Sequence, residues 1–178
     1  MQKIIYAIGH STRTWENFIE LLQTFSIEML ADVRSYPGSR RYPHFNKESL
    51  LKELPEKNIQ YQHIANLGGR RKALSQSKNT AWKNDAFRGY ADYMDTAEFK
   101  SGIQELEKIA STYRTAFMCS EAVWWRCHRS LIADDLKVRG WKVYHILNNK
   151  KAEEHPFTAP AKIVNGKLSY AATQQSIF

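Results

Sequence analysis

The sequence has only two cysteines in 178 residues, and it has no apolar run that approaches the roughly 18 residues of a membrane span. Residues 1–3 lead into an apolar stretch that is too short for the core of a secretory signal. Without such a signal, Cys119 and Cys127 are expected to be reduced thiols, because disulfides persist mainly in oxidising compartments. These absences predict a cytoplasmic protein that makes no membrane contact.

Several catalytic signatures are also missing. The sequence has no G-x-G-x-x-G, no P-loop and no G-x-S-x-G motif. The C-x5-R loop of cysteine phosphatases would require an arginine at Ala133 after Cys127, or at Trp125 after Cys119. The phosphatase loop is therefore excluded.

Acidic residues are scarce relative to basic ones. Lys and Arg number 26 against 18 Asp and Glu, which gives a formal charge of +8. A positive field attracts anionic partners such as nucleic acid, nucleotides or phosphorylated small molecules. A basic surface that is merely solvated explains the same total, so charge alone leaves both interpretations open.

Short apolar runs alternate along the chain with segments of helical spacing. Strands are predicted at residues 4–8, 29–33, 59–64, 115–119 and 142–146. Helices are predicted at residues 47–54, 85–94 and 96–109, after the cap at Thr14, and from near Cys127 to Gly140. Strand–helix–strand alternation gives parallel strands. We therefore expect an α/β fold: a single-domain three-layer sandwich with a mainly parallel, Rossmann-like central sheet.

The chain shows no linker, internal repeat or low-complexity segment, so residues 1–178 are predicted to form one domain. Its core covers about residues 4–146, and residues 147–178 form a C-terminal extension. Within the extension, Asn165 and Gly166 separate two short β-rich runs. This pattern predicts a short β-hairpin with a two-residue turn.

Polar side chains gather where the predicted strands end. They are His10 and Ser11 after the first strand, Asp32 and Arg34 at the second, Cys119 and Glu121 at the fourth, and Cys127, His128 and Arg129 at the start of the next helix. In open α/β sheets, ligands bind at the carboxyl ends of the strands. If the strands are parallel, these side chains share one edge of the sheet.

Each of these residues also has a purely structural explanation. His10 could cap a turn, and a cysteine such as Cys119 in an apolar strand is more often an inert core residue. A buried carboxylate needs a partner. A structural salt bridge from Asp32 to Arg34 or Arg129 therefore explains that residue as well as a catalytic role does.

Cys127 is the stronger thiol candidate. It is predicted in the first turn of a helix, where it is flanked by Arg126, His128 and Arg129. Backbone N–H groups and positive charge both favour a thiolate.

A metal site is the other interpretation of the two thiols. Cys119, Cys127, His128 and His10 could in principle meet at one ion. The C-x7-C-H spacing lacks the short C-x2-C clip of structural zinc sites. We therefore assign no metal ligand from the sequence, and it identifies no cofactor.

Two basic loops, at residues 36–45 and 68–84, mix cations with aromatic residues. Guanidinium groups bind phosphates and aromatic rings stack on bases, so the mixture suits a nucleotide or a single strand. Alternatively, the aromatic residues form core and the cations are solvated. For Tyr90 and Tyr93, which have helical spacing, the core interpretation is favoured.

Six motifs in order resemble domain-of-unknown-function family 488. They are Ile8-Gly9-His10-Ser11, Asp32-Val33-Arg34-Ser35-Tyr36-Pro37, Leu67-Gly68-Gly69-Arg70, Phe87-Arg88-Gly89-Tyr90-Ala91-Asp92-Tyr93-Met94, Met118-Cys119-Ser120-Glu121 and Cys127-His128-Arg129. The resemblance spans about residues 4–146. It implies a compact α/β fold in which these motifs belong together, and it supplies no reaction.

The favoured hypothesis is an enzyme that acts on a phosphate-bearing nucleotide or nucleic-acid substrate at this edge of the sheet. The candidate catalytic residues are Cys127, Cys119, His10, Asp32, Glu121 and His128, and the candidate substrate-binding residues are Ser11, Arg34, Arg70, Tyr90 and Arg129. Two alternatives stay open: a nucleic-acid-binding module without turnover, and a metal-dependent enzyme with Cys and His ligands. The sequence does not determine the oligomeric state.

Overall fold

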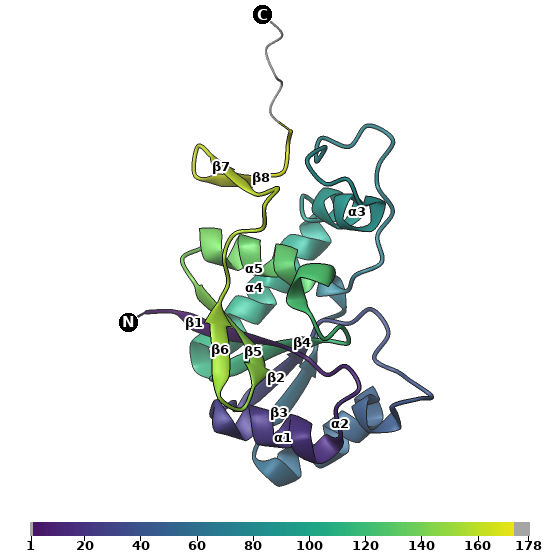
Figure 1. The fold of residues 1–178 in the computed structure, drawn as a ribbon, viewed down its shortest axis with the longest axis vertical. Coiled ribbons are helices and arrows are strands. Elements are labelled where there is room, and N and C mark those ends of the chain that lie inside the picture. Colours follow the sequence, from purple (N-terminus) through teal and green to yellow (C-terminus); the bar gives the residue numbers. More distant parts are fainter. Residues whose placement is uncertain (1, 173–178) are drawn as a thin grey trace, which may run out of the picture.

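A six-stranded sheet forms the centre of the protein (Figure 1), in a computed structural model that describes residues 2–172. The strands are β1 (Ile4–Gly9), β2 (Met29–Asp32), β3 (Gln60–His63), β4 (Thr115–Cys119), β5 (Lys142–Asn148) and β6 (Lys151–Glu154). Their order in the sheet is β3-β2-β4-β1-β5-β6. All pairings are parallel except that of β5 with β6, so the predicted mainly parallel sheet is confirmed.

Helices cover both faces of this sheet. They are α1 (Trp15–Thr24), α2 (Lys47–Glu53), α3 (Asp85–Tyr93), α4 (Ala97–Thr112) and α5 (Arg129–Val138), with short 3-10 turns η1 (Pro43–Phe45), η2 (Pro55–Lys57), η3 (Ala65–Leu67) and η4 (Trp124–Arg126). Helices α1 and α2 pack on one face, and α3, α4 and α5 contribute to the core on the other (Figure 1). The predicted three-layer sandwich is therefore confirmed.

The apolar runs form strands because both faces of the sheet are buried. In β1, Ile5 and Ala7 belong to the core under α4 and α5, whereas Tyr6 and Ile8 belong to the core under α1 and α2. Successive side chains of a strand point to opposite faces. A strand covered on both sides therefore reads as a continuous apolar run without polar alternation.

Helix α1 begins where the sequence predicts its cap. The side chain of Thr14 accepts a hydrogen bond from the backbone N–H of Asn17 at 3.2 Å. Phe18, Leu21 and Leu22 of this helix are buried against the sheet. This packing fixes the connection from β1 to β2 on one face, which becomes important for the location of the pocket.

The C-terminal extension contains one predicted and one unpredicted hairpin. The predicted hairpin consists of β7 (Lys162–Val164) and β8 (Lys167–Ser169), and its turn residues Asn165 and Gly166 both have positive φ, at 50° and 73°. Positive φ at both central positions is the geometry that Asn-Gly favours. Strand β6 was not predicted, because its sequence Lys-Ala-Glu-Glu lacks apolar alternation; charged side chains are common on edge strands.

Residues 173–178, the last part of the predicted extension, lie outside the described residues. Within residues 2–172, no helix is long and apolar enough to cross a membrane.

Candidate functional site

A topological switch point lies at the carboxyl ends of the neighbouring strands β1 and β4. The chain leaves β1 towards α1 on one face of the sheet, and it leaves β4 towards α5 on the opposite face. In open α/β sheets, ligands bind in the crevice at such a point. A pocket of about 760 Å³ is lined by the residues that follow these two strands.

Nine of the eleven candidate residues predicted from the sequence line this pocket. They are His10, Ser11, Arg34, Arg70, Tyr90, Cys119, Glu121, Cys127 and His128. The other two, Asp32 and Arg129, lie behind the lining and are fully buried. Each of them hydrogen-bonds to a residue of the lining.

Asp32, the last residue of β2, holds the guanidinium of Arg34. Nε and Nη2 of Arg34 donate hydrogen bonds to Oδ1 and Oδ2 of Asp32 at 2.8 and 2.5 Å. The hydroxyl of Tyr61 donates to the same Oδ2 at 2.7 Å, and Nη2 of Arg34 also donates to the carbonyl oxygen of Phe45. Because its oxygens are used in this way, Asp32 positions Arg34 and does not face the pocket.

His10 completes this network as a neutral hydrogen-bond acceptor. Its Nδ1 lies 3.0 Å from the carbonyl oxygen of Ser11, which can only accept, so Nδ1 carries the hydrogen. Its Nε2 then accepts from Nη1 of Arg34 at 3.2 Å. Burial, with the charge of Arg34, lowers the pKa of His10 to about 4, and its ring stacks on Phe45. His10 is therefore neutral at pH 7 and supports Arg34.

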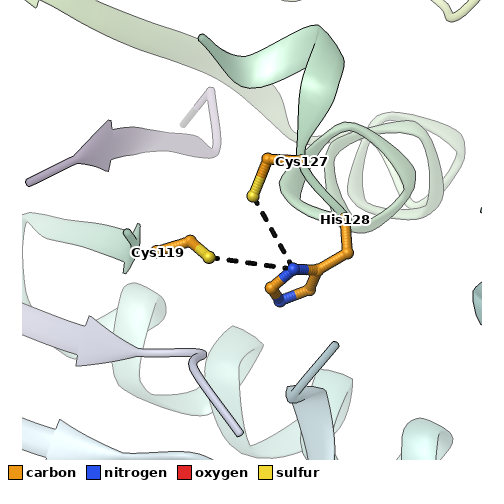
Figure 2. Close-up of side chains that lie close together, drawn as sticks. All are labelled: Cys119, Cys127 and His128. Atoms are coloured by element: carbon orange, nitrogen blue, oxygen red, sulfur yellow. Dashed lines mark hydrogen bonds between the residues drawn. The ribbon is translucent and has the colours of Figure 1, made fainter. Parts of the chain in front are cut away.

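Cys119, Cys127 and His128 form a compact cluster in the pocket (Figure 2). Cys119 ends β4, whereas Cys127 and His128 precede the first residue of α5. The prediction that Cys127 lies in the first turn of that helix is therefore wrong, because Cys127 has an extended backbone between η4 and α5. Nδ1 of His128 lies 3.8 Å from Sγ of Cys119 and 3.6 Å from Sγ of Cys127. All three ligand-type atoms lie within 4.8 Å of one another.

The other ring nitrogen fixes the tautomer of His128. Nε2 lies 2.9 Å from the carbonyl oxygen of Val33, which directly follows β2. A carbonyl oxygen can only accept, so Nε2 carries the hydrogen and Nδ1 presents its lone pair to the two sulfur atoms. The imidazole is thus held between β2 and the two thiols.

The two thiols share their protons unequally. The hydrogen bond between them, together with burial, raises the pKa of Cys119 to about 12. Burial also disfavours the thiolate of Cys127, but the hydrogen bond from Cys119 and the charge of Arg129 outweigh it and lower the pKa of Cys127 to about 6. The directions of the two shifts make Cys127 the more acidic of the two thiols.

Arg129, the first residue of α5, places a buried positive charge behind the cluster. Its Nη2 donates to the carbonyl oxygen of Glu121 at 2.6 Å, and its Nε has no hydrogen-bond partner among residues 2–172. No carboxylate of the described chain lies within ion-pair distance of it. The Cys127 thiolate offsets this charge, since an unpaired buried cation is costly.

Three further arginines, Arg41, Arg70 and Arg126, line the pocket. None of them forms a salt bridge within the described part of the chain. The guanidinium carbon of Arg70 lies 6.0 Å from the ring of Tyr36, which also lines the pocket and is 75% exposed. The mouth of the pocket therefore combines free positive charge with an accessible aromatic ring.

Two non-glycine residues of the pocket have left-handed backbone conformations. Ser11 has φ of 48° and Arg70 has φ of 60°. Such conformations cost of order 1–3 kcal/mol and cluster at functional sites. Both strained positions belong to loops that follow the sheet and line the pocket.

Tyr90 has a more structural position than a substrate-binding role requires. Its side chain is 1% exposed, and its hydroxyl donates to the carbonyl oxygen of Leu67 at 2.7 Å. Its ring lies 5.0 Å from that of His128. Tyr90 therefore packs behind the imidazole, as the helical spacing of α3 suggests.

Sequence reasoning missed a second buried polar network, which ties the C-terminal extension to α5. Asp134 accepts hydrogen bonds from Nε2 of His155, from the backbone N–H and hydroxyl of Thr158, and from the hydroxyl of Tyr170. Nδ1 of His155 in turn contacts Nε2 of His145 at 2.9 Å. The signal in the sequence is an acidic residue, Asp134, three positions after Leu131 among the apolar residues of α5.

Comparison with known proteins identifies the family. The model for the domain of unknown function DUF488 matches residues 14–136, a stretch that includes Asp32, Cys119, Cys127 and His128, while His10 precedes it. A search of curated proteins and a search of solved structures each found no match. Because the matched stretch covers more than half of its length, the chain belongs to the DUF488 family.

Proposed function

We propose that this protein is an enzyme that binds a phosphate-bearing nucleotide, or the end of a nucleic-acid strand, and transforms it at the Cys119–Cys127–His128 cluster. The observation that carries this proposal is that the cluster and four arginines line one pocket. Thiol and imidazole groups supply nucleophilic, acid–base or metal-ligand chemistry. Arginines bind an anion beside these reactive groups.

The arginines support phosphate as the anion. Arg41, Arg70 and Arg126 have no carboxylate partner in the described chain, so their N–H groups are available to a ligand. The planar guanidinium group binds phosphate oxygens in pairs. Arg34 also lines the pocket, where Asp32 and His10 hold its position and Asp32 pairs its charge.

The size of the pocket and its exposed aromatic ring support a nucleotide. A volume of about 760 Å³ is within the range of small-molecule sites, about 300–1,000 Å³. Tyr36 is available for base stacking at the mouth, next to Arg70. A double helix is too large for such a pocket, so the ligand is a mononucleotide or an unpaired strand end.

The cluster favours an enzyme over a pure binding module. Binding to phosphate requires only cations and backbone N–H groups. Two buried thiols facing one imidazole add nothing to phosphate binding, yet they line the same pocket. Buried reactive groups with perturbed pKa values are typical of active sites.

The test separates binding from turnover. We expect wild-type protein to bind nucleoside monophosphates, measured by calorimetry at low salt, with log affinity falling linearly as log salt rises. Arg70→Gln and Arg126→Gln should each weaken binding about tenfold or more, since hydrogen bonds to charged groups contribute about 1.5–3 kcal/mol. Lys100→Gln, an exposed position on α4, is the matched control and should leave affinity unchanged.

Turnover is assayed by incubating the same nucleotides with the protein and analysing products by mass spectrometry. His128→Gln should abolish product formation while nucleotide affinity changes less than about threefold, because the arginines remain. The proposed substrate class would be refuted if the wild type bound no nucleotide, or if Arg70→Gln and Arg126→Gln left the nucleotide affinity unchanged. If the His128→Gln variant still formed product, the Cys119–Cys127–His128 cluster would have no role in the reaction.

A further inference from the structure

The geometry around Nδ1 of His128 is that of a coordination site. The distances from this nitrogen to the two sulfur atoms are 3.6 and 3.8 Å, long for hydrogen bonds from thiols. A tetrahedral zinc ion with bonds of about 2.3 Å to sulfur and about 2.0–2.1 Å to nitrogen separates those ligand atoms by about 3.6 Å. The two nitrogen–sulfur distances are thus those expected around one ion, and the two sulfur atoms lie within 4.8 Å of each other.

Hydrogen bonding alone does not satisfy the cluster. Because Nε2 of His128 donates to Val33, Nδ1 presents its lone pair to two sulfur atoms. The hydrogen of Cys119 is directed at the sulfur of Cys127, so neither sulfur atom donates to this lone pair at close range. A cation at the centre would engage both sulfur atoms and the nitrogen at once.

The surroundings of the imidazole match those of metal ligands. A histidine that binds a metal almost always donates its other ring N–H to a carboxylate, a carbonyl or water. Here that acceptor is the carbonyl oxygen of Val33 at 2.9 Å. The ring is also packed against Tyr90, so its direction is fixed before any ion arrives.

We propose that Cys119, Cys127 and His128 bind one divalent transition-metal ion, with zinc the ion that best suits two thiolates and an imidazole. Residues 2–172 supply three ligands, and all three line the pocket. Three protein ligands with an open position are typical of catalytic zinc, whereas structural zinc takes four. This inference deepens the proposed function, and a catalytic role for the ion rests on that function.

The open position connects the ion to the substrate pocket. A bound zinc ion polarises a phosphoryl or carbonyl oxygen and lowers the pKa of a bound water. Arg70 and Arg126 would hold the anion beside that position. Arg129 places a buried positive charge near Cys127, which favours the thiolate form of that ligand.

The test uses cobalt, whose bonds to thiolates give a charge-transfer band in the near ultraviolet. Reduced, metal-free full-length protein at pH 7.5 should bind one equivalent of Co²⁺, with a band intensity expected for two thiolates. Cys119→Ser and Cys127→Ser should each retain about half of that intensity, and His128→Gln should weaken Co²⁺ binding about 100-fold or more. Ser101→Ala, at an exposed position on α4, is the matched control and should bind as the wild type does.

Circular dichroism checks that each variant is folded, and the wild-type band intensity decides the matter even if a variant fails to fold. No stoichiometric Co²⁺ binding by the reduced wild type, or binding without a thiolate band, would overturn the metal site. Nucleotide binding to the metal-free protein separates the two proposals. If nucleotide binds in an Arg70-dependent way but Co²⁺ does not bind, the metal site fails and the substrate class stands. If Co²⁺ binds but nucleotide does not, the metal site is supported and the proposed nucleotide substrate is refuted.

Discussion

Arg34 and Asp32 form a buried ion pair with two hydrogen bonds, at 2.8 and 2.5 Å, in which neither side chain is more than 6% exposed. The pair links the end of β2 to the pocket, because the same guanidinium contacts His10, a residue that follows β1. One buried interaction therefore fixes the relative positions of two loops of the candidate site.

Asp32→Asn is expected to destabilise the protein by about 3–5 kcal/mol, because it leaves the charge of Arg34 buried without its counter-ion. Urea unfolding followed by circular dichroism measures the change in the free energy of unfolding. Glu153→Gln is the matched control, since it removes one partner of the exposed pair with Lys151 and should cost less than about 1 kcal/mol. Similar losses in the two variants would contradict a structural role for the Arg34–Asp32 pair.

Gly69→Ala is expected to disturb the cluster without straining the backbone. A Cβ at Gly69 would lie 2.9 Å from Nδ1 of His128, so the imidazole must shift, and the φ of Gly69 is not in the left-handed region. We predict that Co²⁺ affinity falls about tenfold, as when a group that orients a ligand is lost. Gly38→Ala, whose Cβ would meet nothing within 4 Å, should leave Co²⁺ affinity unchanged. Equal Co²⁺ affinities for the two variants would contradict the close contact between position 69 and the imidazole of His128.

Acid should destabilise the fold through two histidines that are buried in their neutral form. Burial, aided by nearby positive charge, lowers the pKa of His10 to about 4, and burial with the neighbouring His155 lowers the pKa of His145 to about 2. Both groups have an ordinary pKa of 6.5 in the unfolded chain. Below pH 6.5 the unfolded chain therefore binds protons that the folded protein does not, so stability falls as the pH falls.

Each of these histidines contributes a loss of about 1.4 kcal/mol for each pH unit within its window. For His10 this loss is absent above pH 6.5, develops as the pH falls from 6.5 to about 4, and is complete below about pH 4. Urea unfolding at pH 7, 6 and 5 should show that His10→Gln loses less stability between pH 6 and 5 than the wild type, by about 1.4 kcal/mol. Parallel pH profiles for the two proteins would refute the neutral, buried state of His10.

The C-terminal extension is expected to contribute to stability through Asp134. Thr158→Val keeps the shape of the side chain but removes the hydroxyl that lies 2.5 Å from Oδ2 of Asp134. Loss of a buried hydrogen bond to a charged group should cost about 1.5–3 kcal/mol in the free energy of unfolding. Thr112→Val, at an exposed 3.3 Å contact on α4, should change it by less than about 0.5 kcal/mol. An equally small effect at Thr158 would show that the extension is not anchored in this way.

The sheet and most of the pocket could be predicted from the sequence because they depend on local patterns. A strand buried on both faces is expected to be mostly apolar, and β1 and β4 are, with Thr115 as a buried polar exception at the start of β4. Parallel strands then bring their carboxyl ends to one edge, so His10 and Cys119 were expected close together. The structure places both in one pocket.

Other features depend on contacts that no local pattern records. The C-x7-C-H spacing does not match a known metal-binding motif. In the structure, η4 and the turn before it return the chain to the end of β4, and this brings Cys127 close to Cys119. The partners of Asp134 come from residues 155–170, far along the chain and without periodic spacing. Tyr61 lies in β3, and only the pairing of β3 with β2 shows that it reaches Asp32.

The most direct test of the account is a crystal structure of the protein grown with zinc and a nucleoside monophosphate, with anomalous data collected at the zinc edge. We predict a zinc peak about 2.0–2.3 Å from Nδ1 of His128 and from the sulfur atoms of Cys119 and Cys127. The phosphate should lie in the same pocket, in contact with Arg70 or Arg126. A structure with no anomalous peak between the two thiols, and with the phosphate bound elsewhere, would contradict the account.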